Sequence, residues 1–244
     1  MRLGALCASL ACINDATAPR CSCQRLPDPL MPLIRIPQVV ELDALPRFDG
    51  LHLDQIITPE TPAAFSQAKE ELLGWPQVGF DTESKPTFKV GEVSTGPHLI
   101  QFASPEKAYL FKVGSDGCSE AVSAVLQSDR VLKVGFGLST DRSRLRSRLD
   151  IEMRHFVDLG TTLRYQGKKG QVGLRGAVAA VLGSRVSKSR SVSTSNWSNR
   201  SLTDAQRLYA ANDAYAALMV FLALSGDDEG VFEDRIAAGM QIKR

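Results

Sequence analysis

The segment of residues 78–83, Val-Gly-Phe-Asp-Thr-Glu, places two acidic side chains two residues apart. In a β-strand, successive side chains point to opposite faces, so Asp81 and Glu83 share one face and Phe80 lies on the other. The two carboxylates are then about 6–7 Å apart along the strand, and they repel each other unless a cation or a proton neutralises them. A pair of divalent metal ions about 3.5–4 Å apart would neutralise both. The alternative is a strand end that runs into a polar loop.

Two later segments carry acidic side chains that we expect near this pair. Asp141 follows the apolar segment 131–135 and a short loop, and carboxylates at the ends of neighbouring strands share one crevice. Taken alone, Asp141 also fits a first-turn acid stabilised by a helix dipole. Tyr209 and Asp213 are four residues apart, which places them on one face of a helix. Taken alone, they also fit a simple Tyr–Asp contact on a helix flank.

The elements that must position these residues follow from local patterns. Thr61 before Pro62 predicts one helix N-terminus, and Thr203 with Gln206 matches a capping box at another. Residues 104–107 predict a turn between two antiparallel strands. We predict helices at 59–73, 119–126, 140–149, 174–182 and 203–224, and strands at 78–83, 99–103, 108–112, 131–135 and 155–158. This order indicates an α/β domain with a mixed β-sheet flanked by helices, whose early strands are antiparallel.

The composition is that of an ordinary globular protein. The 244 residues are 43% hydrophobic and 23% charged, which predicts one domain with extensions. The formal net charge of +2 does not by itself indicate nucleic-acid binding, so any basic surface must be local. No apolar run approaches the roughly 18 residues of a membrane span, so we expect no membrane partner.

The cysteines are concentrated near the N-terminus, at Cys7, Cys12, Cys21 and Cys23, with Cys118 apart from them. Their spacing does not match that of zinc ligands, and the cysteine-poor remainder fits a reducing compartment. We therefore expect a soluble, cytoplasmic protein. Residues 1–30 faintly resemble a secretory signal. We interpret them instead as a disordered tail or as non-native sequence. If they are non-native, the true start of the protein is Met31.

Several separated motifs together resemble those of the DEDDy 3′–5′ exonucleases, the group of ribonuclease D and the Werner-helicase exonuclease. The motifs are residues 78–83, 99–102 (Leu-Ile-Gln-Phe), 133–137 (Lys-Val-Gly-Phe-Gly) leading to Asp141, 195–198 (Ser-Asn-Trp-Ser) and 208–215 (Leu-Tyr-Ala-Ala-Asn-Asp-Ala-Tyr). The last run is similar to the Werner-type branch. The resemblance covers about residues 55–225 and implies a ribonuclease H-like fold.

The resemblance also implies a site and a reaction. Asp81, Glu83, Asp141 and Asp213 match the carboxylates that hold two Mg²⁺ or Mn²⁺ ions, and Tyr209 matches the tyrosine that positions the attacking water. Hard dications do prefer carboxylate oxygens. The implied activity is removal of nucleoside monophosphates from nucleic-acid 3′ ends, with DNA weakly preferred over RNA. The implied layout is an extended N-terminal arm at 31–58, the exonuclease domain at 59–225 and a C-terminal extension at 226–244, with no helicase domain in this chain.

Basic side chains near these motifs are expected to contact phosphates: Arg142, Lys168, Lys169, Lys188 and Arg190. The acid-free segment 184–200 fits either a mobile basic segment that meets phosphates or a plain solvated loop. Ser84 and Lys85 stand where Werner-type sequences carry a Trp, which affects contacts to the terminal nucleotide. Two other functions stay open at this point: a non-catalytic nucleic-acid-binding module on the same fold, and a hydrolase of very short oligonucleotides.

Overall fold

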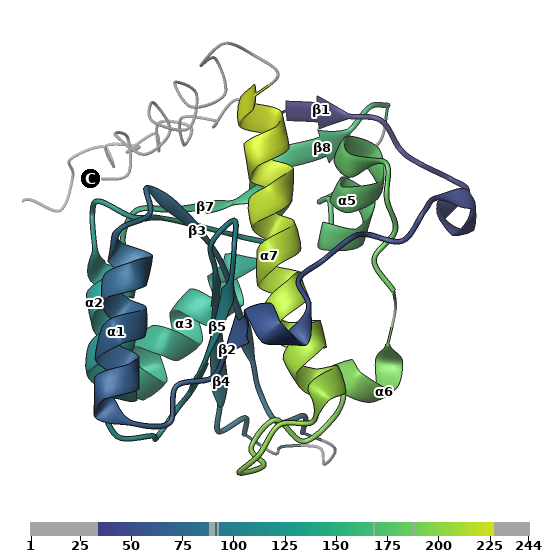
Figure 1. Ribbon diagram of the computed structural model, residues 1–244. Coiled ribbons are helices and arrows are strands. Elements are labelled where there is room, and N and C mark those ends of the chain that lie inside the picture. The colour runs from purple at the N-terminus through teal and green to yellow at the C-terminus, as the bar shows by residue number, and fades with distance from the viewer. Residues whose placement is uncertain (1–33, 88–90, 92, 168, 188, 227–244) are drawn as a thin grey trace, which may run out of the picture.

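The computed structural model describes residues 34–87, 91, 93–167, 169–187 and 189–226. Within these residues a six-stranded sheet lies between two layers of helices (Figure 1). One layer contains α1 (Pro62–Leu73), α2 (Cys118–Gln127) and α3 (Leu138–Leu149). The other contains α7 (Asp204–Gly226), with α5 (Leu174–Leu182) packed beside it. The predicted tail at 1–30 and all but the first residue of the predicted C-terminal extension lie outside the described residues.

The sheet is mixed, as predicted. Its order is β2-β5-β4-β3-β6-β7, formed by β2 (Ile56–Ile57), β3 (Gln77–Glu83), β4 (Leu99–Ala103), β5 (Ala108–Lys112), β6 (Leu132–Gly135) and β7 (Phe156–Asp158). β4 is antiparallel to both β3 and β5, and the other neighbours are parallel. The prediction of antiparallel early strands is therefore confirmed, and β3 lies near the centre of the sheet.

Two helices begin where side chains satisfy their free backbone N–H groups. Before α1, the Oγ1 of Thr61 accepts a 3.2 Å hydrogen bond from the Ala64 N–H, and Pro62 is the first helical residue. Before α7, the Gln206 N–H donates to Thr203 Oγ1 at 3.2 Å, and the Thr203 N–H donates to Gln206 Oε1 at 3.0 Å. The predicted cap and the predicted capping box are both confirmed.

The two faces of β3 meet different layers. Val78 and Phe80 are buried in the core that β3 shares with α1, α2 and α3. Gly79 faces α7, and a Cβ atom at this position would lie only 2.0 Å from the backbone oxygen of Ala214. A larger residue would therefore force α7 away from the sheet. The close approach brings the following residues of β3 against the middle of α7.

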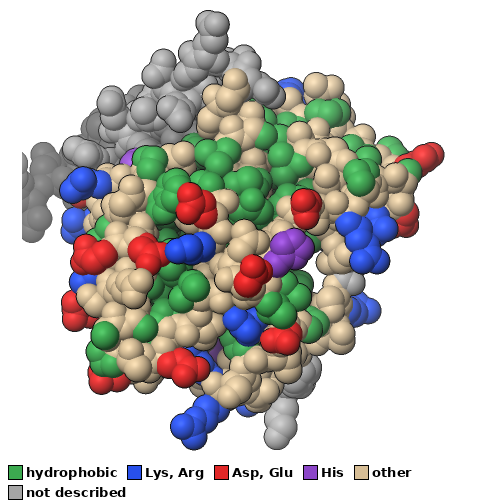
Figure 2. All heavy atoms as spheres, viewed as in Figure 1, with side chains coloured by type: hydrophobic (Ala, Val, Ile, Leu, Met, Phe, Trp, Pro, Cys, Tyr) green, Lys and Arg blue, Asp and Glu red, His purple; other side chains and the backbone are tan. Residues whose placement is uncertain are grey.

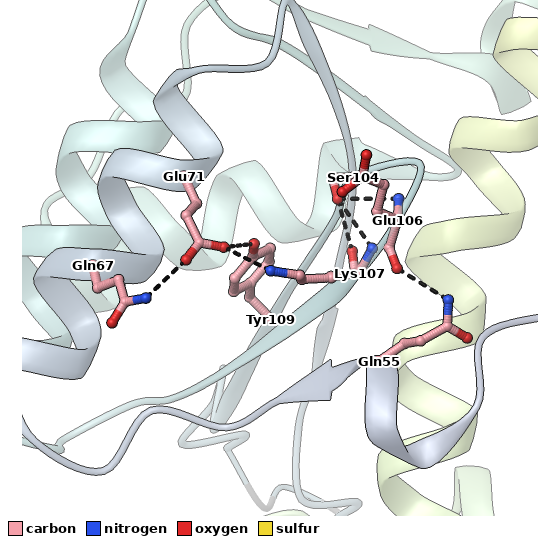
Figure 3. Close-up of polar contacts among 7 residues, drawn as sticks. All are labelled: Gln55, Gln67, Glu71, Ser104, Glu106, Lys107 and Tyr109. Carbon is pink, nitrogen blue, oxygen red and sulfur yellow. Dashed lines mark hydrogen bonds and ion pairs between the residues drawn. The ribbon is translucent and has the colours of Figure 1, made fainter.

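A polar network ties α1 to the β4–β5 hairpin (Figure 3). The Tyr109 hydroxyl donates a 2.5 Å hydrogen bond to Glu71 Oε2, and Lys107 Nζ approaches the same oxygen at 3.3 Å. Gln67 donates to the other carboxylate oxygen at 3.0 Å. The Tyr109 hydrogen bond is the main cause of the lowered pKa of Glu71. The network lies at the end of the sheet far from Glu83, which pairs with the opposite end of β4.

Several described segments carry structure that the sequence patterns did not predict: β1 (Ile34–Ile36), η1 (Leu42–Ala44), η2 (Leu53–Gln55), β2, α4 (Leu159–Thr162), β8 (Leu163–Tyr165) and α6 (Arg190–Ser193). β1 and β8 pair in parallel as a separate two-stranded sheet. The predicted extended arm also packs on the domain. The Leu51 N–H donates to Asn212 Oδ1 at 2.7 Å, and Arg185 Nε donates to the Leu45 carbonyl at 3.0 Å. The described part of the arm is thus part of the folded unit.

The segment 184–200 is more ordered than a plain solvated loop. It contains α6, and its Trp197 side chain is fully buried in the core between α7 and the sheet. The indole N–H of Trp197 lies 3.4 Å from the Ser193 carbonyl. One tryptophan therefore anchors this Ser-rich segment beside α7.

α7 is long and apolar enough to cross a membrane by length and composition alone. α7 packs against the sheet (Figure 1), and several of its alanines are buried together with Leu218. Core helices of folded domains pass the same test, so burial against the sheet accounts for the apolar character of α7.

Candidate active site

Three carboxylates meet where β3 crosses the middle of α7. Asp81 and Glu83 come from the α7-facing side of β3, and Asp213 comes from α7. Each offers an oxygen, and these three oxygens all lie within 4.8 Å of one another. All three side chains are partly exposed, so the group can be reached from solvent. The structure therefore brings together three of the four carboxylates that the sequence singled out.

The electrostatics of this group favour a bound positive charge. Burial, followed by the charges of Asp213 and Asp141, raises the pKa of Glu83 to about 8. Burial raises the pKa of Asp213 to about 6, although its interaction with the Tyr209 hydroxyl acts in the opposite direction. Burial and the neighbouring carboxylates also raise the pKa of Asp81. Among the described residues, no Lys or Arg forms an ion pair with any of the three.

Asp141 borders this group without joining it. It lies in the first turn of α3, and its Oδ1 accepts a 2.5 Å hydrogen bond from the Thr82 hydroxyl. Both side chains are buried, and Thr82 alternates with Asp81 and Glu83 along β3. Burial raises the pKa of Asp141, and the bond from Thr82 partly offsets this. Asp141 is still near enough for its charge to raise the pKa of Asp81 and Glu83.

Tyr209 lies one helical turn before Asp213, and both line a cavity of about 370 Å³. The other lining residues come from the start of α5, from the segment that leads into α6 and from α6 itself: Gly173, Leu174, Arg175, Gly176, Val186, Ser187, Ser189 and Ser193. The Trp197 ring packs against the Tyr209 ring with centroids 6.1 Å apart. Burial, then the charges of Asp213 and Glu83, raise the pKa of the Tyr209 hydroxyl, which therefore remains a proton donor at neutral pH.

The donor set fits a divalent cation. The group of Asp81, Glu83 and Asp213 offers only carboxylate oxygens, the ligands that Mg²⁺ and Mn²⁺ prefer. Desolvated like charges that have no basic partner are stabilised when a cation binds between them. The residues present are thus suited to hold the ions that the sequence resemblance implied.

The predicted phosphate-binding residues have different surroundings. Lys169 and Arg190 are exposed, and Arg190 begins α6 beside the cavity. The guanidinium of Arg142 lies 4.1 Å above the Phe156 ring, which engages it in a cation–π contact. Lys168 and Lys188 lie outside the described residues. On the face in Figure 2, basic and acidic side chains are interspersed, in keeping with the small net charge.

Three neighbours of the site had been assigned no role from sequence. Thr82 holds Asp141, and Arg144 lies one turn after Asp141, where its charge lowers the pKa of that carboxyl. The helical spacing of Asp141 and Arg144 would have revealed this proximity. Gln101 is fully buried on β4, directly opposite Asp81. The register of β3 and β4, which sequence alone does not fix, places it there.

The raised pKa values predict that metal-free protein loses stability as the pH rises. Between the ordinary pKa of 4.5 and the raised value of about 8, the folded state keeps a proton on Glu83 that the unfolded state has lost. We expect the melting temperature in EDTA to fall by roughly 5–10 °C from pH 5 to pH 8.5 through this carboxylate group. Excess Mn²⁺ should reverse the fall, because metal binding displaces the protons.

Differential scanning calorimetry of wild-type protein and the Glu83→Gln variant, with EDTA and with Mn²⁺, measures this effect. The variant lacks the titrating group, so its melting temperature in EDTA should depend less on pH than that of wild type. Identical pH dependence in the two proteins would contradict the assignment of the effect to Glu83.

Comparison with known proteins supports this reading of the geometry. A family model described as 3′–5′ exonuclease matches residues 56–227. The mouse bifunctional 3′–5′ exonuclease/ATP-dependent helicase WRN is 35% identical over 159 residues, which are 64% of this chain and 11% of that protein. The human exonuclease 3′–5′ domain-containing protein 2 is 26% identical over 185 residues, which are 70% of this chain and 29% of that protein. The chain thus spans less than a third of the length of either relative.

Solved structures confirm the ribonuclease H-like α/β fold. The Aedes aegypti Nibbler EXO domain superposes with a TM-score of 0.66 at 24% identity, covering 78% of this chain and 97% of that one. Escherichia coli RNase D superposes with a TM-score of 0.57 at 19% identity, covering 78% of this chain and 51% of that one. Trypanosoma brucei RNase D in complex with RNA U12 superposes with a TM-score of 0.61 at 19% identity, covering 75% of this chain and 69% of that one. At these identities the similarity concerns the fold.

Proposed function

Because the chain belongs to the 3′–5′ exonuclease family, we propose that it hydrolyses the terminal phosphodiester bond at nucleic-acid 3′ ends with the help of two divalent ions. The observation that carries this proposal is the group of three carboxylates within 4.8 Å beside a cavity lined by Tyr209 and Asp213. The products are nucleoside monophosphates and a strand shortened by one nucleotide.

Each residue of the site has a distinct task in this reaction. Asp81, Glu83 and Asp213 would hold the ions. Asp141, which borders this group from the α3 side, would supply the fourth carboxylate. When bound, two such ions supply activation of water and stabilisation of the departing 3′ oxygen. The protonated Tyr209 hydroxyl orients the water toward phosphorus, and Trp197 holds the tyrosine ring in place. Water adds to phosphorus and loses a proton to solvent as the bond to the preceding 3′ oxygen breaks, and that oxygen takes up a proton to become the 3′ hydroxyl of the shortened strand.

The substrate proposed is a nucleic acid with a free 3′ end. The cavity volume of about 370 Å³ lies in the range of roughly 300–1,000 Å³ usual for small-molecule sites and suits one terminal nucleotide. We propose a weak preference for DNA over RNA, because the motif at residues 208–215 is similar to the Werner-type branch. We also propose a cytoplasmic location from the cysteine-poor body of the chain, whose described free cysteine, Cys118, is buried.

Phosphates behind the terminal nucleotide would meet basic side chains. We propose Lys169, Arg190 and Arg142 for this role, together with Lys168 and Lys188. We expect Arg190→Ala to weaken single-strand binding and to reduce the slope of log K against log salt by about 0.7, the value for one lost phosphate contact. Fluorescence anisotropy across a salt series in Ca²⁺ measures both quantities. Arg130→Ala, an exposed arginine before β6, is the matched control, and equal salt slopes in all three proteins would contradict the contact.

The activity itself is tested with three 5′-labelled substrates: single-stranded DNA, a duplex with a recessed 3′ end, and single-stranded RNA. Each is incubated with Mg²⁺ or Mn²⁺, beside EDTA and Asp213→Asn controls. The expected result is a ladder that shortens from the 3′ end and is lost in both controls, and the relative rates give the sugar preference. Binding without shortening would favour a non-catalytic module, and shortening of only the shortest strands would favour an oligonucleotide hydrolase.

A further inference from the structure

Gln101 is a fully buried polar residue that lacks a partner within the part of the chain that the structure describes. Its exposed fraction is 0%, and neither its amide oxygen nor its amide nitrogen forms a hydrogen bond there. A buried amide without partners is costly, and such groups in folded proteins commonly have a functional explanation. The residue lies in the middle of β4, one strand away from the carboxylate site.

The register of the sheet determines which way the Gln101 side chain points. Leu99 and Ala103, two residues before and after it, are buried in the core shared with α7. Ile100 and Phe102 are buried in the core on the other side. Side chains alternate along a strand, so Gln101 faces α7, as Asp81 does.

The polar side chain directly paired with Gln101 on this face is that of Asp81. Across the sheet Gln101 pairs with Asp81 on β3 and with Leu110 on β5. Along its own strand it lies between Leu99 and Ala103. The buried α7 residues of this core are alanines, and Leu208, Tyr209 and Tyr215 are partly buried against it. Directly opposed side chains have Cβ atoms about 4.5–5.5 Å apart, and diagonal neighbours are within reach of long side chains. The amide is therefore placed to reach the Asp81 carboxylate, with Glu83 as the diagonal neighbour.

We infer that Gln101 is a positioning residue for the metal site: once an ion is bound, the Gln101 amide N–H donates to one oxygen of Asp81 and leaves the other oxygen directed toward the ion. This inference rests on the proposed function, because it requires Asp81 to be a metal ligand. An ionised carboxylate only accepts hydrogen bonds, so an amide donor suits it. Groups that orient metal ligands in this way typically change metal affinity by about 10–100-fold when they are removed.

The test uses Gln101→Met, which keeps the length of the side chain and removes the amide. We expect Mn²⁺ affinity, measured by isothermal titration calorimetry without nucleic acid, to fall by about 10-fold or more. The melting temperature in EDTA should equal or exceed that of wild type, because two unpaired buried atoms are gone. Leu110→Met is the matched control, since it changes the other cross-strand neighbour of Gln101 without touching a polar group.

Wild-type Mn²⁺ affinity in Gln101→Met would overturn the inference, as would a lowered melting temperature in EDTA with unchanged affinity, which indicates a purely structural amide. Gln101→Asn keeps the amide but shortens its reach, so it should also lose affinity, and it serves if the methionine variant fails to fold. If wild-type protein and Asp81→Asn bind Mn²⁺ equally, Asp81 is no metal ligand. The two-metal proposal and the inference then fail together, whereas normal wild-type binding with an unaffected Gln101 variant removes the inference alone.

Discussion

Replacing Asp81 with Asn is expected to abolish measurable release of 3′-terminal nucleotides, with a loss of about 10³-fold or more in turnover. Asp81 is the central residue of the carboxylate group. Burial is the largest cause of its raised pKa, and the charges of Asp213, Asp141 and Glu83 raise it further. The amide keeps the size of the side chain and loses the negative charge and one acceptor oxygen. Metal binding should weaken together with turnover, because the ions then lack one ligand.

The folded protein itself should tolerate this change. In EDTA the melting temperature of Asp81→Asn should be at least that of wild type, because the substitution removes repulsion among buried like charges. Asp129→Asn is the matched control, because Asp129 is an exposed acid that pairs only loosely with Arg154 at 3.7 Å. Turnover in Asp81→Asn within tenfold of wild type would show that the reaction does not depend on this carboxylate.

Two features of the site were predictable from sequence because each depends only on the spacing of side chains within one strand or one helix. The two-residue period of a strand puts Asp81 and Glu83 on one face, and helical spacing puts Tyr209 and Asp213 on one face. The structure confirms both relations, because β3 and α7 each supply their pair from one side. The capping residues Thr61 and Thr203 were predictable for the same reason, since capping involves residues only three positions apart.

The parts that depend on packing between elements were not predictable in this way. The hydrogen bond from Thr82 to Asp141 joins β3 to α3, and no period within one element pairs these two residues. The pairing of β1 with β8 joins residues such as Ile34 and Leu163, which no local pattern connects. The burial of Trp197 also follows from where α7 lies and not from the Ser-rich sequence around it.

The same distinction explains why Gly79 matters to the chemistry. A glycine inside a strand often marks a place where another backbone approaches closely, but the sequence alone does not tell which one. In the structure it lets the Ala214 backbone approach β3, and this contact brings Asp213 to the level of Asp81. The site therefore depends on Gly79, which takes no part in the reaction. The need for glycine at this position is explained only by the packing of α7 on β3.

Replacing Tyr209 with Phe is expected to lower turnover by about 10²-fold while the Michaelis constant changes little. The hydroxyl is protonated at neutral pH and lies beside Asp213, so its proposed task is to orient water and not to bind the strand. The aromatic ring remains in the variant and keeps its contact with Trp197, so the cavity wall should be preserved. Steady-state kinetics with a 5′-labelled single strand at saturating Mn²⁺ measures both constants.

Tyr215→Phe is the matched control for this prediction, because it removes a half-buried hydroxyl from the same helix beside Phe48, whose ring centroid is 6.0 Å away. It should retain wild-type kinetics. If Tyr209→Phe instead raised the Michaelis constant and left turnover unchanged, the hydroxyl would act in substrate binding. Equal kinetics in both variants would show that water orientation does not depend on the Tyr209 hydroxyl, and would leave this task to Glu83, whose carboxylate belongs to the same group.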